Sequence, residues 1–146
     1  MKQVETEVPT PVEGVEEIEP APGVKINVAK HVLYISHVDY ATLLWLVAKG
    51  VKNLVVYNRG NTSYLKSTKI LRSAFFDEFG LLRVRTLPIV LSQTSYILRR
   101  LSQEGLVEKV DSYYYALSRK SVLWGIAKNS SPKEIMEFLW EVTMEG

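Results

Sequence analysis

The stretch of sequence that decides the fold is LSQTSYILRRLSQEGLVEKVDSYYYALS, residues 91–118. Its first part carries hydroxyl and amide side chains and then a pair of arginines. A glycine follows, and after it come two runs rich in β-forming residues, LVEKV and YYYAL, which are separated only by Asp111 and Ser112. Runs this close together predict a β-hairpin that directly follows a basic helix.

The first part of this stretch has the periodicity of a helix with one buried side. Thr94, Leu98 and Leu101 recur at spacings of four and three, and Ile97 widens the stripe that they form. Ser92 is the expected N-cap, because its hydroxyl can accept a hydrogen bond from a first-turn amide that otherwise has no partner. The arginine pair and the polar residues then project from other sides of the helix.

The segments before this stretch predict further helices and strands. Residues 62–80, TSYLKSTKILRSAFFDEFG, have the spacing of a long helix, and the LLRV that follows is a short β-type run. Residues 31–58 predict a β-α-β-like element. In it, HVLYIS and KNLVVY are strands, and the helix between them begins after Asp39 and ends at Gly50.

The two ends of the chain differ in character. Residues 1–23 contain six glutamates and one lysine, a net charge of −5, and no aromatic residue. We expect a flexible acidic tail there, because such a segment cannot bury enough apolar surface to offset its ordering entropy. Two helices, RKSVLWGIAKN and PKEIMEFLWEVTM, are expected to finish the chain, the second with Ser131 as its cap and Pro132 in its first turn.

Composition limits the function of the chain. With no cysteine there are no disulfides, thiol nucleophiles or thiolate metal sites, and the two histidines do not suggest a metal centre, so no metal or cofactor is expected. No pattern of catalytic side chains stands out, which argues against an enzyme. No apolar run approaches the roughly 20 residues of a membrane helix, and no signal peptide is present, so we expect a cytoplasmic protein that does not enter a membrane.

Positive charge is concentrated in the middle of the chain. Residues 50–100 contain nine lysines and arginines and only two carboxylates, a net charge of +7. Such a zone suggests a polyanion as partner, although a solvated surface of mixed charge has the same composition.

From residue 62 to residue 118 the chain resembles the winged helix-turn-helix domain, in the broad style of MarR and ArsR regulators. The likeness is carried by LRV, by SQTSYILRRL, by EGLVEKV and by YYYALS. Leu101 and Gly105 keep the spacing with which that family packs its recognition helix, and Gly105, Leu106 and Val107 match its turn into the wing. The resemblance covers well under half of the chain.

With the segments predicted above, the resemblance gives an expected α+β protein with four parts, of which only residues 62–118 rest on the resemblance. These are a flexible acidic tail (1–23), a β-α-β-like extension (24–61), the winged helix-turn-helix (62–118), and two C-terminal helices (119–146) that are expected to form a homodimer through Trp140, Ile135 and Leu139.

The resemblance also implies which residues contact DNA. Arg99 is assigned to the groove and Arg100 to backbone phosphate, and Lys109 and Tyr113 flank the wing turn, where phosphate contact is expected. The full set of expected DNA-binding residues is Ser92, Gln93, Ser95, Tyr96, Arg99, Arg100, Lys109, Tyr113, Arg83 and Arg85. The simpler alternative for the arginine pair is a solvated helix face.

Two functions are consistent with this resemblance. The first is sequence-specific binding of double-stranded DNA by a homodimeric transcriptional regulator. The second is a winged-helix adaptor that binds proteins in a transcription, replication or membrane-remodelling assembly, with the acidic tail as a docking segment for a protein partner. The salt dependence of duplex binding distinguishes them, because phosphate contacts release counterions.

Overall fold

The computed structural model describes residues 15–21, 23–29, 32–75 and 83–144. These residues form seven strands and five helices, and the chain is therefore of the α+β class, as predicted. The strands are β1 (Val15–Ala21), β2 (Val24–Ala29), β3 (Val32–Val38), β4 (Thr62–Leu65), β5 (Arg83–Thr86), β6 (Glu108–Lys109) and β7 (Tyr115–Ser118). The helices are α1 (Tyr40–Val56), α2 (Ser67–Ala74), α4 (Pro88–Gln103), α5 (Val122–Asn129) and α6 (Pro132–Met144).

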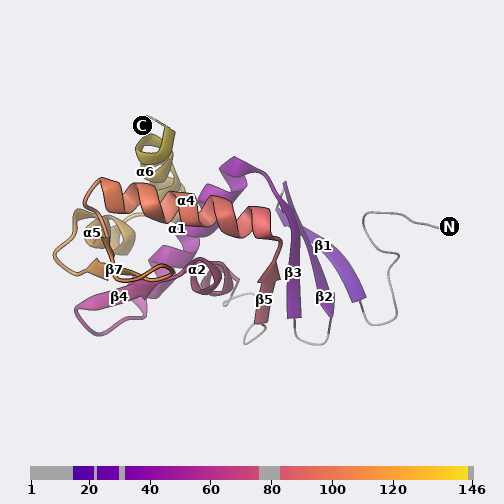
Figure 1. Cartoon of the computed structure of the whole chain (residues 1–146). Helices are drawn as coiled ribbons and strands as arrows, with labels where there is room; N and C mark the ends of the chain where they lie inside the picture. Colours follow the sequence, from indigo (N-terminus) through magenta and orange to yellow (C-terminus); the bar gives the residue numbers. More distant parts are fainter. Residues whose placement is uncertain (1–14, 22, 30–31, 76–82, 145–146) are drawn as a thin grey trace.

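The strands belong to two separate sheets. One sheet has the order β1-β2-β3-β5; its pairs are antiparallel except β3 with β5, which is parallel. The other has the order β4-β7-β6 and is antiparallel throughout. Figure 1 shows the first sheet at one end of the helices and the second sheet at the other end, with α4 running between them.

Helix α1 begins where the sequence predicted. Asp39 is its N-cap, and the Asp39 carboxylate accepts a hydrogen bond from the Thr42 amide at 2.9 Å. This bond stabilises the ionised form and lowers the pKa of the Asp39 carboxyl.

The predicted end of this helix was wrong. Gly50 does not end α1, which continues to Val56, and the strand expected in KNLVVY does not exist. Val55, one of the β-branched residues that suggested a strand, is buried on α1 within the core together with Val51. Burial of this face outweighs the weak preference of valine for strands.

The long helix expected over residues 62–80 is also different in the structure. Its first four residues form β4, in which Ser63 and Leu65 are buried and Tyr64 is exposed, the alternation of a strand with one covered face. Helix α2 begins only at Ser67. The end of the predicted helix lies outside the described residues. The helical spacing of apolar residues was real from Ser67 onward but was extended too far toward the N-terminus.

Helix α4 starts one turn earlier than expected. Pro88 occupies its first turn, with Leu87 as N-cap, so the assignment of Ser92 as N-cap was wrong. Proline suits this position because its fixed φ is already helical and it has no amide to leave unpaired. Only Leu87 separates the end of β5 from this helix.

The N-terminal segment is not flexible over its whole length. Residues 15–21, which were assigned to the acidic tail, form β1 and pair with β2, with Val15 opposite Ala29 and Ile18 opposite Ile26. The composition argument failed here because β1, VEEIEPA, is ordered by pairing with β2 although it contains three of the six glutamates and Pro20. The rest of the expected tail, residues 1–14, lies outside the described residues.

Both predicted C-terminal helices are present: α6 has the predicted bounds, whereas α5 begins three residues later than predicted, at Val122 with Ser121 as its N-cap. Ser131 and Glu134 form a capping box at the start of α6, with Ser131 N donating to Glu134 Oε1 at 2.9 Å and Glu134 N donating to Ser131 Oγ at 3.2 Å. At the end of α5, Lys52 Nζ from α1 donates to the carbonyl oxygens of Ala127, Lys128 and Ser130. A cation at the negative end of a helix dipole stabilises this junction.

The predicted dimer interface needs correction. Ile135 and Leu139 are fully buried inside the protomer, where α6 packs on α1, so they are not available to a partner. Trp140 is different: it is 45% exposed, and its ring lies 6.2 Å from that of Tyr40.

Candidate nucleic-acid interface

Helix α4 has one buried side and one open polar side. Thr94, Ile97, Leu98 and Leu101 are buried against the body, as the periodicity predicted, and Val90 is buried with them. Ile89, in the first turn, is 62% exposed. On the opposite side, Ser92, Tyr96 and Arg99 are exposed. A helix that shows short polar side chains and one long cation to solvent has the chemistry needed to approach base edges in a major groove.

Arg99 is the cation that this side offers. Its guanidinium carbon lies 5.8 Å from the centre of the Tyr96 ring, a cation–π distance that orients the side chain along the helix surface. In the described part of the chain, no carboxylate forms an ion pair with Arg99. The contact with Tyr96 therefore holds the Arg99 guanidinium in place while its N–H groups remain available to a ligand.

Arg100 has a different role from the one predicted. One guanidinium nitrogen donates to the carbonyl of Val142 at 3.0 Å and the other to Gln103 Oε1 at 2.8 Å. It also lies 3.5 Å from the carboxylate of Glu104. These contacts bind Arg100 to the last turn of α6 and argue against the expected contact with DNA phosphate. Arg100 lies one residue, about 100°, further around the helix than Arg99, which turns it to this side.

Tyr96 and Ser95 also make contacts inside the protomer. The Tyr96 hydroxyl donates to the carbonyl of Thr143 at 3.3 Å. Tyr96 and Arg100 therefore both form hydrogen bonds with the last turn of α6. Ser95 is half-buried, and its hydroxyl lies 3.0 Å from that of Ser67 on α2. Ser95 is therefore a contact between α4 and α2, not the exposed base reader that was expected. Gln93 is half-buried.

The predicted hairpin is present, with a longer connection than the tight turn expected. β6 ends at Lys109 and β7 begins at Tyr115. Asp111 Oδ1 accepts from the amides of Tyr113 at 2.8 Å and Tyr114 at 2.9 Å, which closes the turn and lowers the pKa of the Asp111 carboxyl. The exposed residues Lys109 and Tyr113 flank this turn.

Lys66 connects the hairpin to the start of α2, a contact that the sequence did not reveal. Its Nζ lies 5.8 Å from the centre of the Tyr113 ring and 5.1 Å from that of Tyr114. Lys66 and Lys109 thus bring two cations from separate elements to the hairpin. Arg99 adds a third cation on the exposed side of α4, the helix that leads into the hairpin. The only signal for Lys66 in the sequence was its membership of the basic zone.

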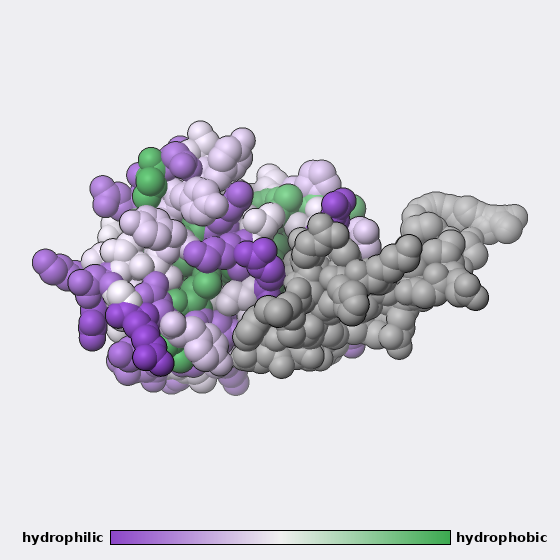
Figure 2. All heavy atoms as spheres, turned by 90° about the horizontal axis from the view of Figure 1, so that it is seen from below, coloured by the Kyte–Doolittle hydropathy of each residue, from purple (hydrophilic) through white to green (hydrophobic). Residues whose placement is uncertain are grey.

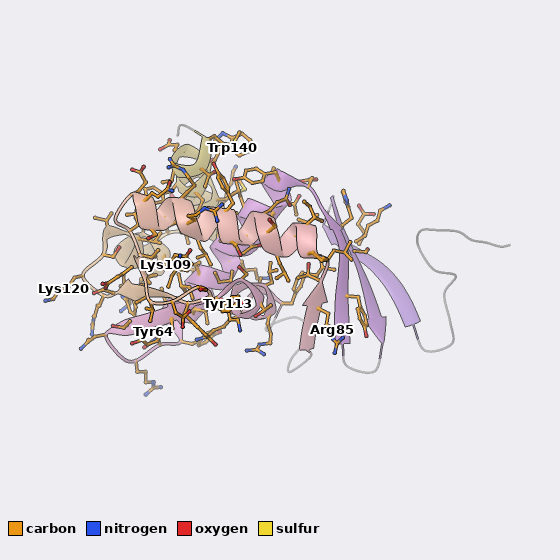
Figure 3. All side chains as sticks on the ribbon, viewed as in Figure 1. Tyr64, Arg85, Lys109, Tyr113, Lys120 and Trp140 are labelled. Carbon is orange, nitrogen blue, oxygen red and sulfur yellow. The ribbon has the colours of Figure 1, made fainter. Side chains whose placement is uncertain are left out.

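The two arginines of β5 do not belong to this group. β5 is part of the other sheet, and Figure 3 shows Arg85 at the far end of α4 from Lys109 and Tyr113. Arg85 is exposed. Arg83 is the first residue of the same strand. The expectation that they act together with the hairpin is not supported by this placement.

The residues described here contain no group of three or more His, Asp or Glu side chains arranged to hold a metal ion. Nor is any helix in the described ranges long and apolar enough to cross a membrane. Comparisons with protein-family models, with curated proteins and with solved structures gave no match to this chain.

Proposed function

We propose that this chain binds double-stranded DNA sequence-specifically through a winged helix-turn-helix and acts as a transcriptional regulator in the cytoplasm. The observation that carries the proposal is the exposed polar side of α4, with Arg99 on it, on the helix that leads directly into the β6–β7 hairpin. Helix–strand–helix–helix–hairpin is the element order of the winged-helix family. The elements α1, β4, α2, α4, β6 and β7 come in this order, with β5 of the other sheet inserted between α2 and α4. In this assignment the domain begins at Tyr40, not at residue 62.

The individual roles follow from exposure and position. Ser92 and Arg99 face the major groove, and the Arg99 guanidinium is suited to the two acceptors of a guanine. Lys66 and Lys109 lie beside the hairpin, where they contact backbone phosphate and position the protein without reading sequence. Arg100 and Ser95 hold α4 in place on α6 and α2 and are not assigned to DNA.

The salt dependence of binding tests this function. We expect the logarithm of the affinity for a duplex to fall linearly with the logarithm of salt concentration, with a slope of about −0.9 for each phosphate contacted. Lys109→Ala should make the slope less steep by about 0.9, the contribution of one phosphate contact. Lys133→Ala is the matched control, because Lys133 is an equally exposed lysine on α6, far from the hairpin in sequence. Titrations by fluorescence anisotropy give these slopes directly.

Two results would contradict the proposal. One is the absence of duplex binding at low salt, and the other is a slope near zero, since neither is compatible with phosphate contacts. Either result would favour the adaptor function, in which the same elements bind a protein.

A homodimer is part of the proposal, through the outward side of α6. Trp140 is 45% and Met144 55% exposed, which is unusual for such large apolar side chains on a terminal helix. Trp140→Glu should give monomers that remain folded, because the Trp140 side chain is not part of the buried core. Sedimentation of both proteins measures this, and a wild-type protein that sediments as a monomer at micromolar concentration would refute the dimer.

A further inference from the structure

The outer face of the β4-β7-β6 sheet is hollowed into an open groove of about 670 Å³. This volume lies within the roughly 300–1,000 Å³ of typical ligand sites. The residues that line the groove are Thr62, Tyr64, Gly105, Leu106, Val107, Glu108, Lys109, Val110, Ala116, Ser118, Lys120 and Ser121. None of the roles assigned to α4 uses this face.

The strand register explains why the groove is hollow. Tyr64 on β4 and Glu108 on β6 both lie opposite Ala116 of the central strand β7, one from each side. Their neighbours Leu65 and Tyr115 are buried, so Tyr64 and Ala116 point away from the core. A tyrosine and a glutamate therefore stand about two strand spacings apart, roughly 10 Å between their Cα atoms, with only a methyl group between them.

The side chains around this slot are suited to a nucleobase. The Tyr64 side chain is 50% exposed and can present a ring face for stacking. Across the slot, the Glu108 carboxylate is an acceptor of the kind that pairs with the amino group of cytosine. Lys120 lines the same groove and supplies positive charge for backbone phosphates.

The surroundings of the groove are also basic. The loop before β4 carries Arg59, the loop after β7 carries Arg119 next to Lys120, and the two loops meet where Arg119 N donates to the Asn61 carbonyl at 2.8 Å. Figure 3 shows Lys120 and Tyr64 at the end of the molecule remote from the first sheet, and Figure 2 shows hydrophilic residues gathered over this end.

We propose that this groove binds an unpaired nucleotide whose base carries an exocyclic amino group, within a single strand of nucleic acid. Tyr64 stacks on the base, Glu108 accepts from its amino group, and Lys120 contacts a flanking phosphate. The groove is separate from the side of α4 that is proposed to read duplex DNA. An experiment can therefore refute single-strand binding by the groove without refuting duplex binding by α4, and the reverse.

The test compares oligodeoxycytidine with oligothymidine, which have similar rings but differ in the amino group. Fluorescence anisotropy is measured above neutral pH, where oligodeoxycytidine stays single-stranded. We expect the wild-type protein to prefer oligodeoxycytidine. Tyr64→Ala should weaken its binding by about 5- to 150-fold, the effect of losing one stacked base, whereas Tyr64→Phe should retain it. Glu108→Ala should bring the two affinities close together.

Control variants keep the outcome unambiguous. Tyr57→Ala removes another exposed tyrosine, 65% exposed at the end of α1 and outside the groove, and should leave binding unchanged. Arg99→Ala should weaken duplex binding only. Equal binding of the two oligonucleotides by the wild type, or an equal loss in Tyr57→Ala and Tyr64→Ala, would overturn the proposal. If no single strand binds at low salt, the proposal also fails, and a peptide becomes the better candidate for the groove.

Discussion

Gly50→Ala should lower the free energy of unfolding by about 3 kcal/mol, although alanine is the better helix former by about 1 kcal/mol. Gly50 is buried in the interior of α1 at its crossing with α2. A Cβ atom there would press against the carbonyl oxygen of Ile70 and lie 2.7 Å from Ile70 Cγ2. The carbonyl belongs to the α2 backbone and cannot rotate away, so the two helices would have to separate. Urea denaturation followed by circular dichroism measures the change.

Gly125→Ala provides the matched control. Gly125 is also a helical glycine, in α5, and a Cβ atom at this position meets no other atom within 4 Å. The same substitution should therefore raise the free energy of unfolding, by about 0.5–1 kcal/mol. If Gly50→Ala is as stable as the wild type, the close crossing of α1 and α2 does not require a glycine at position 50.

Arg99→Ala should cost about 1–3 kcal/mol of affinity on the best duplex and relax the preference at one base position. Arg99→Lys keeps the positive charge but cannot form the bidentate hydrogen bonds of a guanidinium. The salt dependence of binding should therefore be unchanged, and the preference for one base at that position should be lost. Selection of bound sequences from random duplexes, followed by titration of the best site, measures both quantities. An Arg99→Ala protein that is folded and unchanged in affinity and preference would mean that α4 does not read DNA.

Arg100→Ala is the neighbouring control with the opposite expectation. Because Arg100 donates to the Val142 carbonyl, its loss should lower stability, by about 1–2 kcal/mol for a charged hydrogen bond, and leave the slope of salt dependence unchanged. A reduced slope in this variant would show that Arg100 reaches phosphate after all and that its contact with α6 is lost on binding.

The residues around α4 show how far the sequence could predict the site. The stripe of Thr94, Leu98 and Leu101 gave the buried side of the helix correctly, because helical periodicity depends only on local spacing. It also placed Arg99 on the side away from the stripe, but it could not show that Arg100, which was assigned to phosphate, turns to α6. The difference between them comes from α6, whose last turn arrives some forty residues later in the chain and accepts the hydrogen bond of Arg100.

The errors in the fold have a similar origin. β-branched residues led to a strand assignment for residues 53–56, and helical spacing that was extended too far led to a helix assignment for residues 62–65. In the structure, the first segment is helical because Val55 packs into the core, and the second is a strand because Ser63 and Leu65 pair with β7. Long-range packing decided both cases, and such packing overrides propensity differences of well under 1 kcal/mol per residue.

The packing of α6 on α1 has a consequence for synthesis of the chain. The buried side of α1 is covered in part by Ile135 and Leu139, and α6 ends 88 residues after the end of α1. At roughly 5–20 residues per second, a ribosome needs about 4–18 s to produce that length. During this interval α1 lacks its final cover and exposes leucine and valine side chains. A chaperone that binds apolar segments would therefore find its main target in α1, and slower translation beyond Val56 should increase aggregation of the nascent chain.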